Sequence, residues 1–496
     1  MAKKLFKHNE KTDFIMNMTE KSYQKMCYVF LMISAICISL STLVYYFAKG
    51  NKHASFGSDL RYMAESLKHL QVTALFLMVL GFCGILVYLI KIMKKQYSFK
   101  DNKGIALVGI YLILAVISTL LAYSKTISLY GKTGRHEGLI SIIAYIGLFL
   151  AATQLTDGKK TKIICDTIIG IGVLNAIAGI FQSFYSLDGI IPTFFTTNLF
   201  EQNLSFANGF TTSPFALAAL LTMTLALSVN GLMYDDNKKK KLYYGLSSIL
   251  FVAVGLLTNV LPAIVGMSVV LIASIISEIT RLKTGHGLWK RGILNNPLGW
   301  AIICALGAGV VFLLIFATGN FKFYDAYIVT TDSLSRIGAS NPRYTAVSGI
   351  DIYSKTWKEV WSVLKDNWLI GAGPDVIGFE KYKIFDLSSI VGSSDRAYNI
   401  YLNIAASTGI PSLLACLGFV AVTLKRGFKG IKNFFNLNGN WTKSAITIAC
   451  IGYLAQGFFN ISIITVSPIF FVLLGLAYGS ASKSKSNSKS KTKEAK

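Results

Sequence analysis

The sequence predicts an all-α polytopic membrane protein with about 12 transmembrane helices. Hydrophobic residues make up 53% of the 496 residues and charged residues 15%, whereas a soluble domain is typically about 25% charged. The apolar residues gather in long runs, and a helix needs roughly 20 such residues to cross a bilayer core of about 30 Å. The charged residues lie in short clusters between these runs.

The apolar runs predict spans at 24–47, 71–92, 104–123, 138–155, 163–184, 213–231, 242–258, 261–279, 298–318, 399–423, 443–461 and 465–480. The first run is long and lacks a small-residue cleavage site, so we interpret it as a retained helix rather than a signal peptide. The chain then divides into an N-terminal segment 1–23, a transmembrane domain 24–480 and a Lys/Ser-rich tail 481–496 that we expect to be disordered.

Lysine and arginine gather in alternate connections, among them "DGKKTK", "DDNKKKK" and "LKRGFKGIK". The positive-inside rule assigns these connections, and both termini, to the cytoplasm. Segment 185–212 contains no Lys or Arg, which fits an outside location, whereas loop 48–70 fits less well because it contains four basic residues. We attribute the net charge of +25 to topology and to anionic membrane lipids rather than to nucleic acid.

The seven cysteines all lie in apolar runs without a CxxC pair, and the five histidines are scattered. This pattern predicts neither a disulfide framework nor a metal site, and we expect no cofactor.

The segment 319–398, between the ninth and tenth predicted spans, forms a large outer loop with an amphipathic helix at about 350–369. One face of this helix holds Tyr353, Trp357, Val360, Trp361, Leu364 and Trp368. Such a helix is typical of a membrane interface, where it either packs on the ends of the spans or covers a cavity. The following Gly371, Gly373 and Pro374 predict a helix stop and a turn, which does not by itself require Asp375.

Five patches occur in an order that resembles the O-antigen ligase and polysaccharide polymerase superfamily of bacterial envelope proteins. They are "YGKTGRHEGLISIIAYIG", "NGFTTSPFALAALL", "DNWLIGAGPDVIG", "DRAYN" running into "YLNIAASTGIPSLL", and "ISIITVSPIFFVLLGLA". The resemblance covers roughly residues 100 to 480. Two positions depart from it: Tyr398 stands where relatives have a histidine, and Val260 and Leu261 stand where relatives tend to have an arginine.

The resemblance implies a metal-independent glycosyltransferase of the bacterial cytoplasmic membrane whose active site faces outward. Its donor would be a polyprenyl-diphosphate-linked glycan and its acceptor a second glycan, and a ligase and a polymerase remain equally open. The departures leave a non-catalytic relative as an alternative. A transporter or flippase is a further alternative, although ionisable residues avoid the middle of the predicted spans, where a coupled carrier usually has some.

Arginines bind phosphate in a bidentate manner, and we expect outer-loop arginines to bind the diphosphate. We expect Tyr398 to orient the acceptor hydroxyl, because a phenol is a poor base at neutral pH, and Asp395, Asp375, Glu137 or His136 to take the proton. Arg396 either binds substrate or pairs with Asp395. The candidate substrate-binding residues are Arg135, His136, Glu137, Arg336, Arg343, Arg396 and Asn399.

Overall fold

A computed structural model describes residues 18–42, 59–93, 103–132, 135–184, 207–211, 213–258, 260–283, 350–378, 396–435 and 441–479. All regular secondary structure in these residues is helical. The predicted span 298–318, most of the outer loop 319–398 and the tail lie outside the described residues, as do Arg336, Arg343 and Asp395.

Eight helices of the described part are long and apolar enough to cross a membrane, so the chain is a multi-pass membrane protein. They comprise α2 (Glu20–Ser39), α4 (Asp59–Met93, apolar from Leu70), α5 (Lys103–Leu121), α8 (Gly158–Phe184), α9 (Pro214–Tyr234), α10 (Lys238–Leu257), α11 (Leu261–Lys283) and α16 (Ile410–Phe435). The remaining helices are α6 (Lys125–Tyr130), α7 (Leu139–Ala152), α13 (Ile350–Asp366), α15 (Ile400–Thr408), α17 (Trp441–Gln456) and α18 (Ser467–Gly479).

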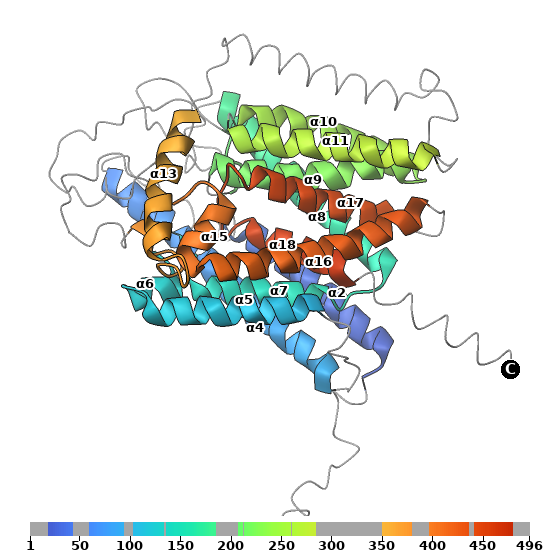
Figure 1. The fold of residues 1–496 in the computed structure, drawn as a ribbon. Helices are drawn as coiled ribbons and strands as arrows, with labels where there is room; N and C mark the ends of the chain where they lie inside the picture. Colours follow the sequence, from blue (N-terminus) through green and yellow to red (C-terminus); the bar gives the residue numbers. More distant parts are fainter. Residues whose placement is uncertain are drawn as a thin grey trace, which may run out of the picture.

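Helix α9 lies at the centre of the bundle and packs against α8, α10, α11 and α17 (Figure 1). Its sequence is apolar on all sides and rich in small residues, which suits a helix with no solvent-facing or lipid-facing side. Ser213 begins the helix by accepting a hydrogen bond from the Ala216 N–H, and Pro214 occupies the first turn, where a missing N–H is tolerated.

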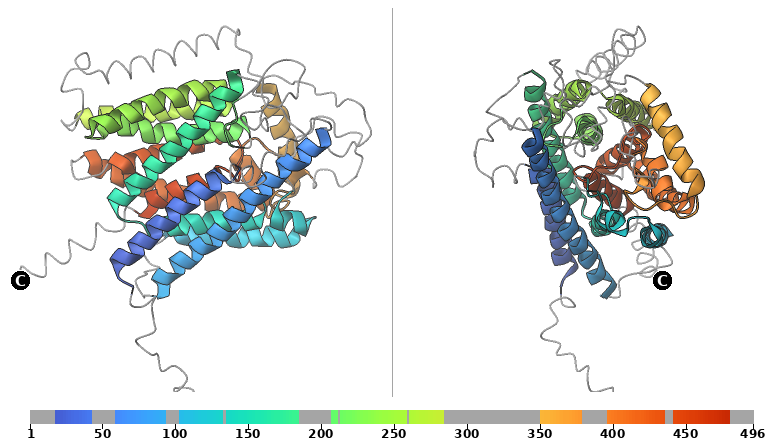
Figure 2. Two further views of the ribbon diagram at one scale, coloured as in Figure 1. Left: turned by 180° about the vertical axis from the view of Figure 1, so that it is seen from behind. Right: turned by 90° about the vertical axis from the view of Figure 1, so that its left-hand side faces the viewer.

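Helices α2, α4 and α8 cross one side of the bundle obliquely (Figure 2). Contact between α4 and α7 depends on glycine, because a Cβ atom at Gly147 would lie 2.0 Å from the Gly81 carbonyl oxygen. Small residues allow such close approach between helices in a membrane, where dispersion contacts replace the hydrophobic effect.

The two ends of the bundle differ in charge. At one end α13 runs across the direction of the long helices, near α6 and α15 (Figure 1); we call this the α13 end. At the opposite end α8, α10 and α17 begin and α16 finishes; we call it the lysine-rich end. Its basic residues are Lys159, Lys160, Lys162, Lys238, Lys239, Lys240, Lys241, Lys425, Arg426, Lys429 and Lys443.

Helix α13 occupies most of the range predicted for the amphipathic helix and packs against α15. Tyr353, Val360 and Leu364 are buried as the periodicity predicts. Trp361 and Trp368 are instead 51% and 56% exposed. They lie at the edge of the buried face, where an indole ring can contact the interfacial region of a bilayer.

The predicted span 399–423 is two helices rather than one. Gly409 separates α15 from α16 with a φ of 92°, a left-handed conformation that favours glycine. The first helix also differs from its prediction, since α2 begins at Glu20 rather than at 24. Thr19 caps it there by accepting a hydrogen bond from the Ser22 N–H.

Candidate functional site

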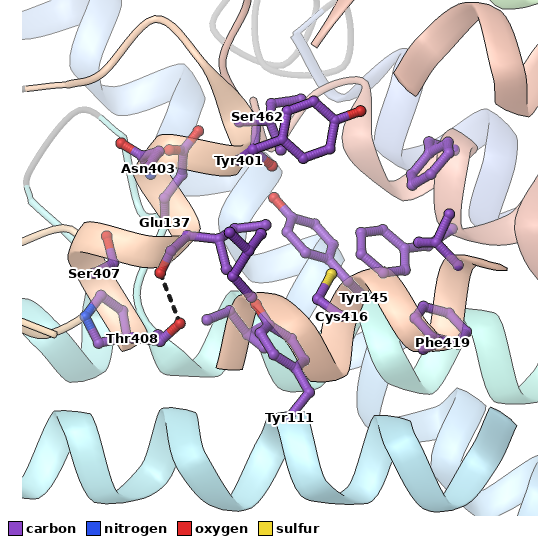
Figure 3. Close-up of a pocket in the computed structure, with 18 of the residues that line it drawn as sticks. Tyr111, Glu137, Tyr145, Tyr401, Asn403, Ser407, Thr408, Cys416, Phe419 and Ser462 are labelled. Atoms are coloured by element: carbon purple, nitrogen blue, oxygen red, sulfur yellow. Dashed lines mark hydrogen bonds between the residues drawn. The ribbon is translucent and has the colours of Figure 1, made fainter. Parts of the chain in front are cut away.

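The site is a cavity of about 130 Å³ between α5, α7, α15, α16, α17 and α18. Figure 3 shows Glu137, Asn403, Ser407 and Thr408 on one side of the cavity and Phe419 on the opposite side, where the lining is mainly aromatic and aliphatic. The polar lining residues are Tyr111, Glu137, Tyr145, Asp375, Arg396, Tyr401, Asn403, Ser407, Thr408, Tyr453 and Ser462. We call Glu137, Asp375 and Arg396, the three charged lining residues, the cavity mouth.

Short helices place polar loops beside this cavity. Helices α7 and α18 contain 14 and 13 residues, so each is roughly 20 Å long at 1.5 Å per residue and falls short of a bilayer core. The connection between α17 and α18 is therefore drawn into the bundle, and Asn460, Ile464 and Thr465 within it are buried. Short or interrupted apolar helices of this kind mark binding sites in other membrane proteins.

An ion pair between Arg135 and Asp375 joins two loops at the α13 end. The Arg135 Nη2 and Asp375 Oδ1 atoms are 2.9 Å apart, and the two side chains are 10% and 5% exposed. The other carboxylate oxygen of Asp375 accepts a hydrogen bond of 2.6 Å from the Lys132 backbone N–H. Asp375, which the turn alone did not require, thus fixes segment 371–378 against segment 131–138.

A second ion pair joins the same α6–α7 loop to the segment before α15. Here the Arg396 Nη2 atom lies 3.7 Å from the Glu137 Oε2 atom, and the side chains are 14% and 13% exposed. This separation exceeds the 2.7–2.9 Å of a charge-assisted hydrogen bond. The Glu137–Arg396 pair is therefore looser than the Arg135–Asp375 pair, and both of its members line the cavity.

Backbone strain collects at the same three loops. The non-glycine residues with positive φ in the described chain are His136, Asp375 and Tyr398, with φ of 56°, 59° and 46°. Each costs of order 1 kcal/mol or more, and such residues cluster where surrounding structure holds a functional group in place. All three lie within two residues of a charged member of the two ion pairs.

The Gly371–Gly373 turn supports α15 rather than binding a phosphate. The Ala372 and Gly373 N–H groups donate hydrogen bonds of 2.8 Å to the Ala406 and Ser407 carbonyls. A Cβ atom at Gly371 would lie 2.3 Å from the Ser407 carbonyl carbon. The turn therefore satisfies carbonyl groups that the end of α15 leaves without helical partners.

Of the predicted site residues, the structure brings Glu137, Asp375 and Arg396 to the cavity and places Arg135 directly behind them. His136 lies between Arg135 and Glu137 in the α6–α7 loop and does not line the cavity. Its burial lowers the pKa of the imidazole, although the nearby Asp375 carboxylate acts in the opposite direction. His136 is therefore neutral near pH 7.

Tyr398 and Asn399 do not line the cavity. The Tyr398 ring packs against the main core, with its centroid 5.5 Å from that of Phe215. Asn399 caps α15, since its side-chain oxygen accepts hydrogen bonds from the Tyr401 and Leu402 N–H groups. The side chain at position 398 thus faces the packed core.

Several polar lining residues escaped the sequence analysis because each is isolated within an apolar run. Asn403 and Ser407 lie in α15, Tyr145 lies in α7, and Ser462 lies in the α17–α18 connection. The available signal was a polar residue inside an apolar membrane segment, because burying a polar side chain there costs free energy unless it has a partner or a function. Within the described residues, no group of three or more His, Cys, Asp or Glu side chains is arranged to hold a metal ion.

Comparison with known proteins adds no family assignment, because the chain matches no family model and no curated protein sequence.

Proposed function

We propose that this protein is a glycan ligase or polymerase of the bacterial cytoplasmic membrane. It would transfer a polyprenyl-diphosphate-linked oligosaccharide to a glycan acceptor on the outer face, in cell-surface polysaccharide biosynthesis. The observation that supports this proposal best is the cavity, which combines a charged mouth with an aromatic and aliphatic interior. A lipid-linked sugar has the same division between a charged head and an apolar chain.

The cavity mouth suits the chemistry of this transfer. Departure of a lipid diphosphate from a sugar leaves negative charge on the phosphates, and a fixed guanidinium group in a partly dry site stabilises such charge well. Arg396 lines the cavity and is only 14% exposed. The lipid would extend along the apolar lining of α5 and α16, where exposed residues such as Ile113 and Leu414 face the membrane.

The outward orientation rests on the charge difference between the two ends of the bundle. With the lysine-rich end in the cytoplasm, as the positive-inside rule expects, the cavity mouth and α13 face out. With about 12 spans, both termini would lie inside. The test compares two cysteine variants at exposed positions, Lys365→Cys in α13 and Lys239→Cys in α10. In whole cells, a membrane-impermeant thiol reagent should label only Lys365→Cys above the labelling of the parent protein. Labelling of Lys239→Cys alone would reverse the orientation.

The deciding experiment uses the purified protein in vesicles with a radiolabelled polyprenyl-diphosphate oligosaccharide and a glycan acceptor. We expect labelled glycan to join the acceptor without added metal, and a chelator to leave the rate unchanged. Movement of the intact labelled lipid across the vesicle membrane without transfer would instead indicate the flippase alternative. Donor binding without transfer or movement would indicate a non-catalytic relative.

A further inference from the structure

The geometry points to Glu137 as the group that takes the proton from the acceptor hydroxyl, with Tyr145 positioning that hydroxyl. This inference rests on the proposed function, and it assigns the proton transfer to the cavity itself rather than to residue 398, which lies outside it. Glu137 would be a catalytic residue and Tyr145 a positioning residue.

Glu137 is better placed as a base than the other carboxylate of the cavity mouth. Asp375 is held by Arg135 at 2.9 Å and by the Lys132 N–H at 2.6 Å. These partners engage both of its oxygens. Glu137 lies across a longer gap of 3.7 Å from Arg396, and it lines the cavity in which the acceptor would bind.

Tyr145 supplies a second and independent observation. The residue is 5% exposed and lines the cavity, and its buried hydroxyl interacts with the Ser462 side chain. Figure 3 shows this hydroxyl pointing toward Ser462. It lies within electrostatic range of both Glu137 and Arg396. A phenolic hydroxyl can donate one hydrogen bond and accept others, so an acceptor hydroxyl bound in the cavity would bind Tyr145 beside Ser462.

The Tyr145 ring is fixed in place by its neighbours. It stacks on Phe471 with ring centroids 5.1 Å apart and an interplanar angle of 11°. Beyond Ser462, the hydroxyl groups of Ser467 and Tyr453 continue the polar contacts at 2.8 and 2.9 Å. A rigid hydroxyl beside a carboxylate suits the positioning of a sugar hydroxyl, because a reacting group must be held near its attacking geometry.

The transfer then balances as a single displacement. The acceptor oxygen bonds to the anomeric carbon of the donor while its proton moves to the Glu137 carboxylate. The bond between that carbon and the phosphate oxygen breaks, and its electron pair leaves with the lipid diphosphate. Arg396 turns to the diphosphate, where its guanidinium group stabilises the negative charge of the leaving group. Glu137 afterwards releases its proton to water.

The first test compares Glu137→Gln with the parent protein in the vesicle assay. General acid–base catalysis typically raises a rate by about 10²–10⁴-fold. We therefore expect kcat to fall by at least about 10²-fold in Glu137→Gln, while labelled donor still binds. Below the optimum, the rate of the parent protein should rise with pH, and this limb should be absent in Glu137→Gln. Glu137→Asp should keep the limb with an intermediate rate, which guards against a variant that merely misfolds.

The control is Glu278→Gln. Glu278 is also a buried carboxylate, and its Oε2 atom accepts a 2.7 Å hydrogen bond from Tyr234, but it lies toward the lysine-rich end. We expect Glu278→Gln to transfer glycan at the rate of the parent protein. If the parent protein and this control both fail to transfer, the proposed function is wrong. If both transfer and Glu137→Gln stays within threefold of them with the same pH profile, the assignment of Glu137 alone is wrong.

Tyr145→Phe tests the positioning role separately. Removal of one hydroxyl should raise KM for the acceptor by about fivefold, since one hydrogen bond is worth about 1 kcal/mol, while donor KM and the pH profile stay unchanged. An unchanged acceptor KM would overturn the role of Tyr145. A change in donor KM alone would overturn it as well, because the hydroxyl would then contact the donor.

Discussion

The two ends of the bundle use the same interaction for different purposes. At the lysine-rich end, Lys240 pairs with Asp166 at 2.7 Å and Lys162 pairs with Asp235, so that α8 is joined to α10 and to the end of α9. At the α13 end, Arg135 and Arg396 pair with Asp375 and Glu137 across loops. The first group connects regular helices, whereas the second borders a cavity and includes strained backbone.

This difference separates structural from functional charge. The lysine-rich pairs lie at helix ends with ordinary capping, such as the Asn237 side chain that accepts from the Lys239 N–H. The α13-end pairs use arginine, whose planar guanidinium can exchange a carboxylate for a phosphate without losing its geometry. We therefore expect substitutions at the α13 end to reduce activity, and those at the lysine-rich end to reduce stability alone.

Asp375→Asn should have the largest effect. It removes the carboxylate from a pair with side chains 10% and 5% exposed and leaves the Arg135 charge buried, which costs about 3–5 kcal/mol. Transfer should fall by more than about 10²-fold, because both loops of the cavity mouth lose their connection. Thermal unfolding and vesicle transfer would be measured together, and Asp157→Asn is the control because its pair with Lys160 is more exposed. Normal transfer by Asp375→Asn would remove the distinction between the two ends.

Gly409→Ala should have the next largest effect. An added Cβ would lie 2.2 Å from the Leu369 carbonyl oxygen at a φ of 92°, and we expect a loss of about 2 kcal/mol or more, because neither the close contact nor the positive φ suits alanine. Gly109→Ala is a matched control, since a Cβ there meets no atom within 4 Å and a helical Gly→Ala change stabilises by about 0.5–1 kcal/mol. Equal unfolding temperatures for the two variants would contradict this account of the α15–α16 break.

Asp235→Asn should lower stability by about 1–2 kcal/mol, since the partner Lys162 is partly exposed, and should leave transfer unchanged. Burial acts to raise the pKa of Asp235, but the hydrogen bonds and charge of Lys162 and its neighbours lower it overall. A lowered pKa means stability that is present above the unfolded value of about 3.9 and lost as pH falls through the folded value. Below about pH 4, the unfolding temperature should therefore fall further in the parent protein than in Asp235→Asn. An identical acid response would exclude this pair as a source of stability.

Tyr398→Phe should have the smallest effect. The ring contact with Phe215 is kept, and the residue does not line the cavity. We expect transfer to fall by less than about tenfold, equivalent to about 1.4 kcal/mol, at saturating donor. A fall of about 10²-fold or more would return the acceptor-orienting role to Tyr398.

Hydropathy predicted most of the helices, because apolar runs of this length have few other stable structures in a membrane. It did not predict the break at Gly409, because residues 399–423 were interpreted as one apolar run although Gly409 followed by Pro411 is a helix-stop signal. The break depends on a tertiary contact, in which the Ile410 N–H donates to the Trp368 carbonyl. The residue Gly409 itself gave only a weak signal, since glycine is common within membrane helices.

The sequence analysis selected the charged residues of the site, but it did not predict that Arg135 pairs with Asp375 or that Glu137 pairs with Arg396. Lys132 and Asp375 are 243 residues apart in the chain, and periodicity has no information about contacts at that distance. Tyr398 shows the opposite case, where a motif position suggested a role but the local backbone directs the ring to the core.

The most direct test of the central claim is photo-cross-linking with a photoreactive polyprenyl-diphosphate sugar in vesicles, followed by mapping of the labelled peptides. We predict labelling within 396–420, which excess unlabelled donor prevents and which Arg396→Ala weakens. Labelling that maps instead to the lysine-rich end, near Asp166 or Tyr244, or that spreads over lipid-facing helices without competition, would contradict the assignment of the α13-end cavity as the donor site.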